Sequence, residues 1–260
     1  MANKKRMLAA IVIIIIALSV SLQVFLNKAY RVPILMYHSV DYAIDKENRM
    51  FVSPEAFDRQ MKFLRSRNYN VVTLEEAVEY LAENKTPPPR TVAITMDDGF
   101  ADNYKYAYPV LKRYKIPATM FVVAGFAGRE DRLSWPEIKE MSDSGVIDIE
   151  SHTMLHPFLT GIDDNALKNE LEDSKRILEE KLGKKVKFIC YPMGVYDERV
   201  KSAAKKAGYE AGFATKPTEF THEADIFAIK RIRISSTADN LFVFWIKVSG
   251  YHEFFKVMRK

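Results

Sequence analysis

Two short motifs combine residue types that can hold a metal ion and move a proton. The first is Thr95-Met96-Asp97-Asp98-Gly99, in which two carboxylates follow an apolar run. Successive side chains at a strand end point in different directions, so one carboxylate could bind a metal while the other faces a substrate. Asp and Gly also favour turns, and for this motif alone a plain turn is the simpler interpretation.

The second motif is Ser151-His152-Thr153-Met154-Leu155-His156, which holds two of the five histidines of the chain. On a helical turn, His152 and His156 would lie on one side, within reach of one cation. Two unrelated surface histidines are the alternative interpretation. Combined, the motifs predict one Asp and two His ligands with a coordination position left for water, as in catalytic zinc sites. The remaining aspartate could take the proton of that water.

Two further segments are weaker candidates. Residues 190–197 lead from a predicted strand into a Pro/Gly loop, which can aim a backbone N–H at a developing oxyanion. His38 follows the first predicted strand, although a lone histidine is often structural. Cys190 is the only cysteine, which excludes an intramolecular disulfide and a zinc site built from cysteines. We therefore expect any metal to be held by histidines and carboxylates.

Strand-like and helix-like segments alternate along the chain, which is typical of an α/β fold with a largely parallel sheet. Helix signals are Ser53 before Pro54, a capping box of Thr73 with Glu76, and a stop at Gly183. The predicted strands are residues 33–37, 91–96, 118–123, 146–150, 186–190 and 229–234. Because the polar motifs follow strand ends, we predict a barrel with its site at the C-terminal ends of the strands.

The N-terminal segment predicts export and a membrane anchor. Residues 1–6 are basic, and residues 7–26 are almost continuously apolar. About 20 apolar residues span a bilayer core, and the preceding charges favour a cytoplasmic N-terminus. A cleaved signal peptide is the alternative, but the apolar run continues beyond its possible cleavage sites. We expect a single-pass cell-membrane protein with a linker at 27–31 and an extracytoplasmic domain at 32–260.

The length and composition fit one large domain. The chain has 260 residues, 48% of them hydrophobic, which is enough for a full core. Its formal net charge of +5 comes from basic residues spread along the chain rather than clustered. No nucleic-acid-binding signature accompanies this charge, so nucleic acid is not an expected partner.

The motifs, in this order, resemble the polysaccharide deacetylase family, also called the NodB-homology or carbohydrate esterase family 4 group. The first motif is similar to the family's Thr-Phe-Asp-Asp-Gly signature, with Met96 in place of Phe. The second is similar to its paired-histidine signature. Residues 32–40, 117–122 and 191–194 also look like family segments, and the Tyr37-His38 pair resembles the branch that acts on poly-N-acetylglucosamine.

This resemblance implies a distorted (β/α) barrel that removes acetyl groups from N-acetylated cell-envelope polysaccharide, either exopolysaccharide, peptidoglycan or chitin-like oligomers. It implies a divalent metal, usually zinc. The implied roles are general base for Asp97, metal ligand for Asp98, His152 and His156, oxyanion donor for the Met193 N–H, acid for His38, and substrate contact for Tyr191 and Pro192.

Two features depart from the family pattern. Many members carry an arginine that orients the base at the start of the third motif, where this chain has Cys190. Many also carry a late histidine as general acid, whereas here His222 precedes the last predicted strand and His252 lies near the terminus. A catalytically impaired, glycan-binding envelope protein is therefore an alternative, and an amidase acting on a small molecule is another.

Overall fold

The computed structural model describes residues 30, 32–42, 50–215 and 225–251, with isolated positions 11, 13–15, 17–18 and 21. Among these residues, no helix has the length and apolar character needed to cross a membrane. The predicted basic N-terminus lies outside the described residues, as do most of the predicted anchor and linker. Tyr30, from the predicted linker, is buried, and its hydroxyl donates to the carbonyl of Thr91. The folded domain therefore includes Tyr30.

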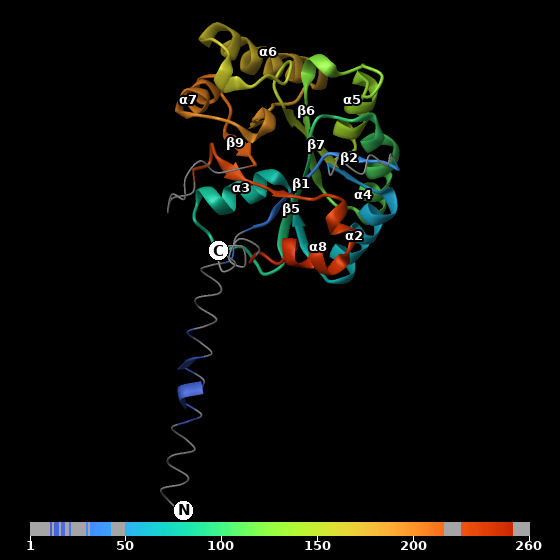
Figure 1. Ribbon diagram of the computed structural model, residues 1–260, viewed down its shortest axis with the longest axis vertical. Helices are drawn as coiled ribbons and strands as arrows, with labels where there is room; N and C mark the ends of the chain where they lie inside the picture. Colours follow the sequence, from blue (N-terminus) through green and yellow to red (C-terminus); the bar gives the residue numbers. More distant parts are fainter. Residues whose placement is uncertain are drawn as a thin grey trace, which may run out of the picture.

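Parallel strands form the centre of the domain, and helices surround them (Figure 1). The central strands are β1 (Ile34–Tyr37), β5 (Thr91–Met96), β6 (Ala118–Val122), β7 (Ile147–Ser151), β8 (Phe188–Cys190) and β9 (Ala211–Ala214). Nearly all of their residues are buried, as expected for parallel strands covered on both faces. The short β4 (Asn70–Val72) pairs with β5, and β2 (Ser39–Val40) pairs with β3 (Phe51–Val52) in a separate two-stranded sheet.

One bent segment closes the main sheet into a nearly complete barrel. β10 (Ile229–Lys230) pairs with β9, and β11 (Ile232–Arg233) pairs with β1. Because β9 and β1 lie towards opposite ends of the strand order, Arg231 joins the two edges. The sequence predicted one strand at 229–234, but the segment divides because its halves pair with different neighbours. The predicted distorted (β/α) barrel is confirmed.

The bend places the Arg231 side chain inside the barrel, where the residue is 3% exposed. Its Nη1 and Nη2 each lie 2.6 Å from a different oxygen of Asp97, and Nη1 also donates to Thr95 Oγ1 at 2.9 Å. Such bidentate pairs fix geometry as well as charge. Burial raises the pKa of Asp97, but Arg231 outweighs this and holds the pKa below its usual value. The residue that links the barrel edges therefore also keeps Asp97 ionised.

The helices begin and end largely where the capping signals predicted. The Ser53 side chain caps α2 (Pro54–Ser66), and Thr73 with Glu76 forms a capping box on α3 (Leu74–Ala82). α6 (Asp164–Leu182) ends at Gly183, which has a φ of 67°. The remaining helices are α4 (Tyr108–Tyr114), which continues a π-helical turn at Asn103–Ala107, α5 (Trp135–Asp143), α7 (Glu198–Lys206) and α8 (Leu241–Val248).

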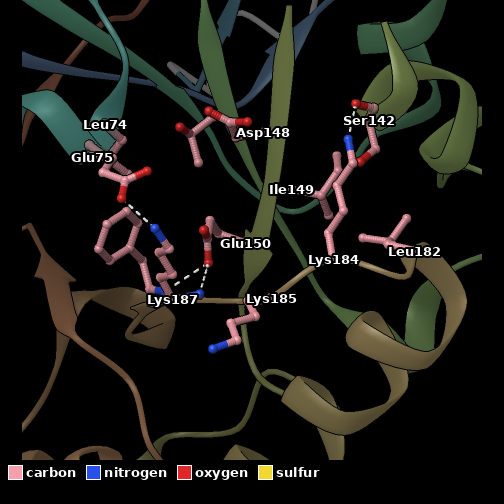
Figure 2. Close-up of a pocket in the computed structure, with 12 residues that line it drawn as sticks. Leu74, Glu75, Ser142, Asp148, Ile149, Glu150, Leu182, Lys184, Lys185 and Lys187 are labelled. Carbon is pink, nitrogen blue, oxygen red and sulfur yellow. Dashed lines mark hydrogen bonds and ion pairs between the residues drawn. The ribbon is translucent and has the colours of Figure 1, made fainter. Parts of the chain in front are cut away.

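A polar pocket of about 100 Å³ is lined by residues of β7, by the lysines that precede β8 and by Glu75 of α3 (Figure 2). Glu150 of β7 lines it and is 5% exposed. Its Oε2 accepts hydrogen bonds from the backbone N–H groups of Lys187 and Phe188, at 2.8 and 2.7 Å. Burial is the main cause that raises the pKa of Glu150 to about 8. This carboxyl group therefore couples folding to pH.

We predict that Glu150→Gln removes a pH-dependent loss of stability. A carboxyl group whose pKa rises to about 8 on folding stabilises the domain fully below its unfolded pKa. That contribution is lost as the pH rises towards 8, whereas glutamine accepts the same hydrogen bonds without titrating. Between about pH 5 and about pH 8.5, wild-type protein should lose a few kcal/mol relative to the variant, measured by urea denaturation with chelator. The control Glu172→Gln, at an exposed position of α6, should keep the wild-type slope. A wild-type slope in Glu150→Gln would contradict the prediction.

We predict that Arg231→Met destabilises the domain by about 3–5 kcal/mol, because it leaves the Asp97 carboxylate buried without its partner. The matched control is Arg233→Met, which replaces an exposed arginine two residues along and should cost at most about 0.5 kcal/mol. The double variant Arg231→Met/Asp97→Asn should recover part of the loss. Urea denaturation midpoints measure these differences, and equal costs at positions 231 and 233 would refute the role given to the ion pair.

Candidate metal centre

The side chains of the predicted site meet because parallel strands end at the same rim. His38 follows β1, the two aspartates follow β5, His152 follows β7 and Cys190 ends β8. The strands occupy one continuous stretch of the sheet. Loops at the C-terminal ends of barrel strands are the usual place for catalytic residues, and here they bring together groups far apart in the sequence.

Asp98, His152 and His156 come close enough to share one cation. Asp98 Oδ1 lies 3.4 Å from His152 Nε2 and 3.6 Å from His156 Nε2. One donor atom from each of the three residues lies within 4.8 Å of the other two. A tetrahedral zinc ion with bonds of about 2.0–2.1 Å separates its ligands by about 3.3–3.4 Å. The three predicted ligands therefore fit a divalent cation.

A hydrogen bond fixes the orientation of the His152 ring. Nδ1 lies 2.8 Å from the carbonyl oxygen of Cys190. Because a carbonyl can only accept, Nδ1 carries the proton, and Nε2 is the nitrogen that faces Asp98. A backbone carbonyl behind a ligating histidine is a common support of metal sites, because it sets both the tautomer and the ring angle.

The charges of the three groups favour a cation between them. Burial raises the pKa of Asp98, but its histidine neighbours hold that pKa well below the usual range. Burial opposes protonation of His152, yet Cys190 and the hydrogen-bonded Asp98 carboxylate raise its pKa well above normal. Burial and the neighbouring His152 lower the pKa of His156 to about 4. A proton and a metal ion thus compete for Nε2 of His152, and metal binding releases the proton.

The two histidines lie on a loop, not on the helical turn that their spacing predicted. Thr153 and His156 have positive φ values of 68° and 59°, which no helix accommodates. Glu170 of α6 accepts hydrogen bonds from the N–H groups of Met154 and Leu155, at 2.9 and 2.8 Å. Thr153 Oγ1 accepts one from the His156 N–H at 3.0 Å. Side chains, rather than a helical backbone, bring the rings together.

Backbone strain gathers in the loops of the site. Asp98, Thr153, His156 and Met193 all have φ between 56° and 71°, a region that non-glycine residues rarely adopt. Such strain persists only where surrounding contacts enforce it, and it is frequent at functional sites. Each of the three predicted motifs contributes at least one of these residues.

The arginine that the sequence seemed to lack is supplied by the bend between β10 and β11. Cys190 stands at the family's arginine position, but the Arg231 guanidinium holds Asp97 instead. Sequence reasoning missed Arg231. Its signal was strand periodicity, because Arg231 lies two residues after the buried Ile229 and therefore on the same face.

His38 lies beside this cluster. The residue is 8% exposed, and its Nδ1 is buried without a hydrogen-bond partner among the described residues. Burial lowers the pKa of His38, which the nearby Asp97 and Asp98 only partly offset. Asp102, another residue that the sequence reasoning missed, accepts hydrogen bonds from Ser39 Oγ and the Val40 N–H and so fixes the segment after His38. His222 and His252 lie outside the described residues.

The third motif places its residues in different environments. Met193 is at the tip of the loop with its side chain exposed. Pro192 is buried. The Tyr191 side chain lies in the core, and its hydroxyl donates to the carbonyl of Phe227 at 3.0 Å. This leaves the Tyr191 side chain no free surface for the predicted substrate contact. The loop can therefore contact substrate only through its backbone or through residues other than Tyr191.

Known proteins are similar to this chain in sequence. The family model described as polysaccharide deacetylase matches residues 84–212. YxkH of Bacillus subtilis (strain 168), whose name describes it as a polysaccharide deacetylase, is 38% identical over 209 residues. The match covers 80% of this chain and 73% of the relative. The poly-beta-1,6-N-acetyl-D-glucosamine N-deacetylase of Staphylococcus aureus (strain MSSA476) is 34% identical over 216 residues, covering 78% of this chain and 73% of the relative.

A solved structure agrees with these sequence relatives. The Streptococcus pyogenes deacetylase PplD, determined in complex with acetate, superimposes with a TM-score of 0.73 at 30% identity. The match covers 82% of this chain and 97% of PplD. The chain therefore belongs to the polysaccharide deacetylase family and is a hydrolase of the amide bonds of N-acetylated sugars.

Proposed function

We propose that this protein is a metal-dependent deacetylase that removes acetyl groups from the N-acetylglucosamine units of a cell-envelope polysaccharide. The observation that carries the proposal is the meeting of Asp98, His152 and His156 beside Asp97, an ionised carboxylate outside that triad. The similarity to a Staphylococcus aureus enzyme named for poly-beta-1,6-N-acetyl-D-glucosamine favours an exopolysaccharide over peptidoglycan or chitin-like oligomers.

The triad would hold a divalent ion, and zinc suits one carboxylate and two imidazoles. When bound, such an ion polarises the acetamide carbonyl and lowers the pKa of water. The protein's own contribution is to orient the ligands. The Cys190 carbonyl aims Nε2 of His152, and Glu170 holds the loop that carries both histidines.

Asp97 acts as the general base. It is buried beside the triad, and Arg231 keeps it ionised, which is the form that can accept a proton from water. Both of its oxygens contact the guanidinium, so the carboxylate has one fixed orientation. Arg231 therefore acts as a positioning residue for the base.

His38 and Met193 complete the proposed machinery. Among the described residues, Nδ1 of His38 has no hydrogen-bond partner, which marks a buried imidazole with unused hydrogen-bonding capacity next to the two aspartates. We assign His38 the transfer of a proton to the leaving amine. The Met193 N–H, on the strained loop after β8, is assigned to the tetrahedral oxyanion. Tyr191 supports this loop from the core, where its hydroxyl donates to the Phe227 carbonyl, and Pro192 is buried beside it.

The location is proposed from the N-terminal sequence. Residues 7–26 would anchor the chain in the cell membrane, with residues 1–6 in the cytoplasm and the domain at 32–260 outside. The chain enters the domain through Tyr30 at the N-terminal end of β1, whereas the site lies at the C-terminal ends of the strands. The site would then face away from the membrane, towards envelope polysaccharide.

The alternative of a non-catalytic glycan-binding protein rested on departures from the family pattern. One of them, the missing arginine, is compensated by Arg231. His38 occupies a position from which it can replace the missing late histidine as acid. The observed site therefore favours the enzyme.

We predict that Asp97→Asn lowers acetate release by at least about 100-fold, because it removes the proton acceptor. Its metal content should stay at the wild-type level, since Asp97 is not one of the three proposed ligands. His152→Ala should lose both metal and activity. Acetate release from poly-beta-1,6-N-acetylglucosamine oligomers, with and without chelator, measures activity, and elemental analysis measures bound metal.

Asp173→Asn, on the solvent-facing side of α6, is the control and should match wild type in both measurements. Urea denaturation checks that Asp97→Asn remains folded. Near-normal acetate release by Asp97→Asn would overturn the assignment of the base. Full activity in chelator would overturn the role of the metal, and release from peptidoglycan fragments alone would overturn the substrate class.

A further inference from the structure

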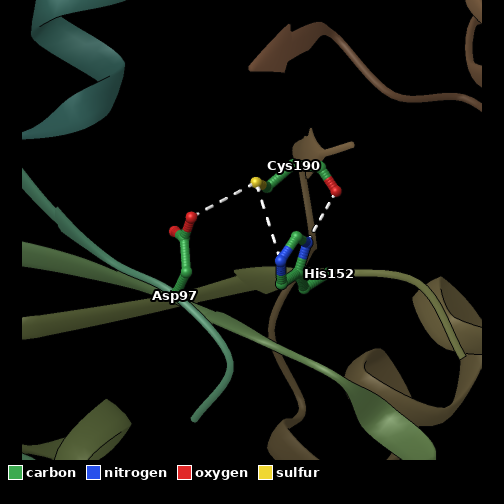
Figure 3. Close-up of side chains that lie close together, drawn as sticks. All are labelled: Asp97, His152 and Cys190. Atoms are coloured by element: carbon green, nitrogen blue, oxygen red, sulfur yellow. Dashed lines mark hydrogen bonds between the residues drawn. The ribbon is translucent and has the colours of Figure 1, made fainter. Parts of the chain in front are cut away.

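Asp97, His152 and Cys190 form a second set of metal donors next to the proposed triad. Cys190 Sγ lies 3.6 Å from Asp97 Oδ2 and 3.9 Å from His152 Nε2, between the two side chains (Figure 3). One donor atom from each residue lies within 4.8 Å of the other two, and all three residues are buried. Tetrahedral coordination with a metal–sulfur bond of about 2.3 Å separates sulfur from oxygen or nitrogen by about 3.5–3.6 Å. The spacing therefore suits a single ion.

We propose that these three residues form a second metal site, one that takes thiophilic divalent cations such as Cd²⁺ and that cannot be filled together with the first. Both sites need the same atom, Nε2 of His152, because Nδ1 donates to the Cys190 carbonyl. One nitrogen lone pair binds one ion. Occupation of either site therefore empties the other.

The charge of Arg231 opposes every divalent cation at the second site, so only an ion with a strong preference for sulfur uses it. Its Nη2 lies 2.9 Å from Cys190 Sγ and 2.6 Å from Asp97 Oδ2. An incoming cation therefore meets the positive guanidinium and a carboxylate that is already hydrogen-bonded to it. Ions that gain little from sulfur find better ligands in Asp98, His152 and His156. A thiophilic ion gains a metal–thiolate bond that only Cys190 offers, and binding releases the thiol proton to solvent.

The proposed site goes beyond the expectation, drawn from the cysteine count, that any metal is held by histidines and carboxylates. One cysteine excludes a site built from several thiolates, but the fold brings that cysteine against a histidine and an aspartate. An ion held there would take both His152 and Asp97 out of the proposed reaction. This inhibitory consequence rests on the proposed function, whereas the site itself does not.

The test uses absorption rather than activity. Cys190 is the only cysteine of the chain, so a thiolate-to-cadmium charge-transfer band in the ultraviolet can arise only from this residue. The full chain, loaded with one equivalent of Zn²⁺, is titrated with CdCl₂. We expect the band to grow as zinc is released, with total bound metal staying at one equivalent. No band at saturating Cd²⁺, or zinc and cadmium bound together, would overturn the proposal.

Two matched histidine variants separate the site from a lone reactive thiol. His156→Ala removes a ligand of the first triad only and should keep the band. His152→Ala removes the shared ligand and should weaken cadmium binding at least about tenfold. Cys190→Ser should abolish the band. Equal cadmium affinity in the two histidine variants would show binding by the thiol alone and overturn the site. None of these readings depends on acetate release, so they hold whichever way the deacetylase assay turns out.

Discussion

The buried ion pair between Arg231 and Asp97 is the interaction on which the architecture and the site both depend. Two charges in the interior are tolerated only when each satisfies the other, and here the guanidinium contacts both carboxylate oxygens. Arg231 reaches Asp97 because the chain bends between β10 and β11 to join the two edges of the sheet. Closing the barrel and preparing the carboxylate are thus one structural event.

The site around this pair is assembled from loops that would not hold their shape alone. Asp98, Thr153, His156 and Met193 occupy strained backbone conformations, and carboxylates from neighbouring elements stabilise the loops. Glu170 fixes the loop of the two histidines from α6, and Asp102 fixes the segment after His38. Precise ligand geometry is therefore a property of the packed domain rather than of the motif sequences.

His152 connects the parts of the site. Its Nδ1 is held by the backbone of β8, and its Nε2 faces donors on two sides, Asp98 with His156 on one and Cys190 with Asp97 on the other. The replacement of the family's arginine by Cys190 therefore does more than remove a positive charge. It introduces a sulfur donor, while Arg231 restores the charge from the bend between β10 and β11.

The sequence by itself determined most of the strands, three helix boundaries and the two motifs that bear the proposed ligands and base. These features depend on local patterns, namely apolar runs such as residues 91–96, capping residues such as Ser53 and Thr73, and paired carboxylates or histidines. Only the tertiary structure decided that the histidines lie on a loop, that Arg231 pairs with a residue 134 positions away, and that Cys190 lies against His152. Such contacts depend on strand order and on where the barrel closes, and neither is encoded in any short stretch of sequence.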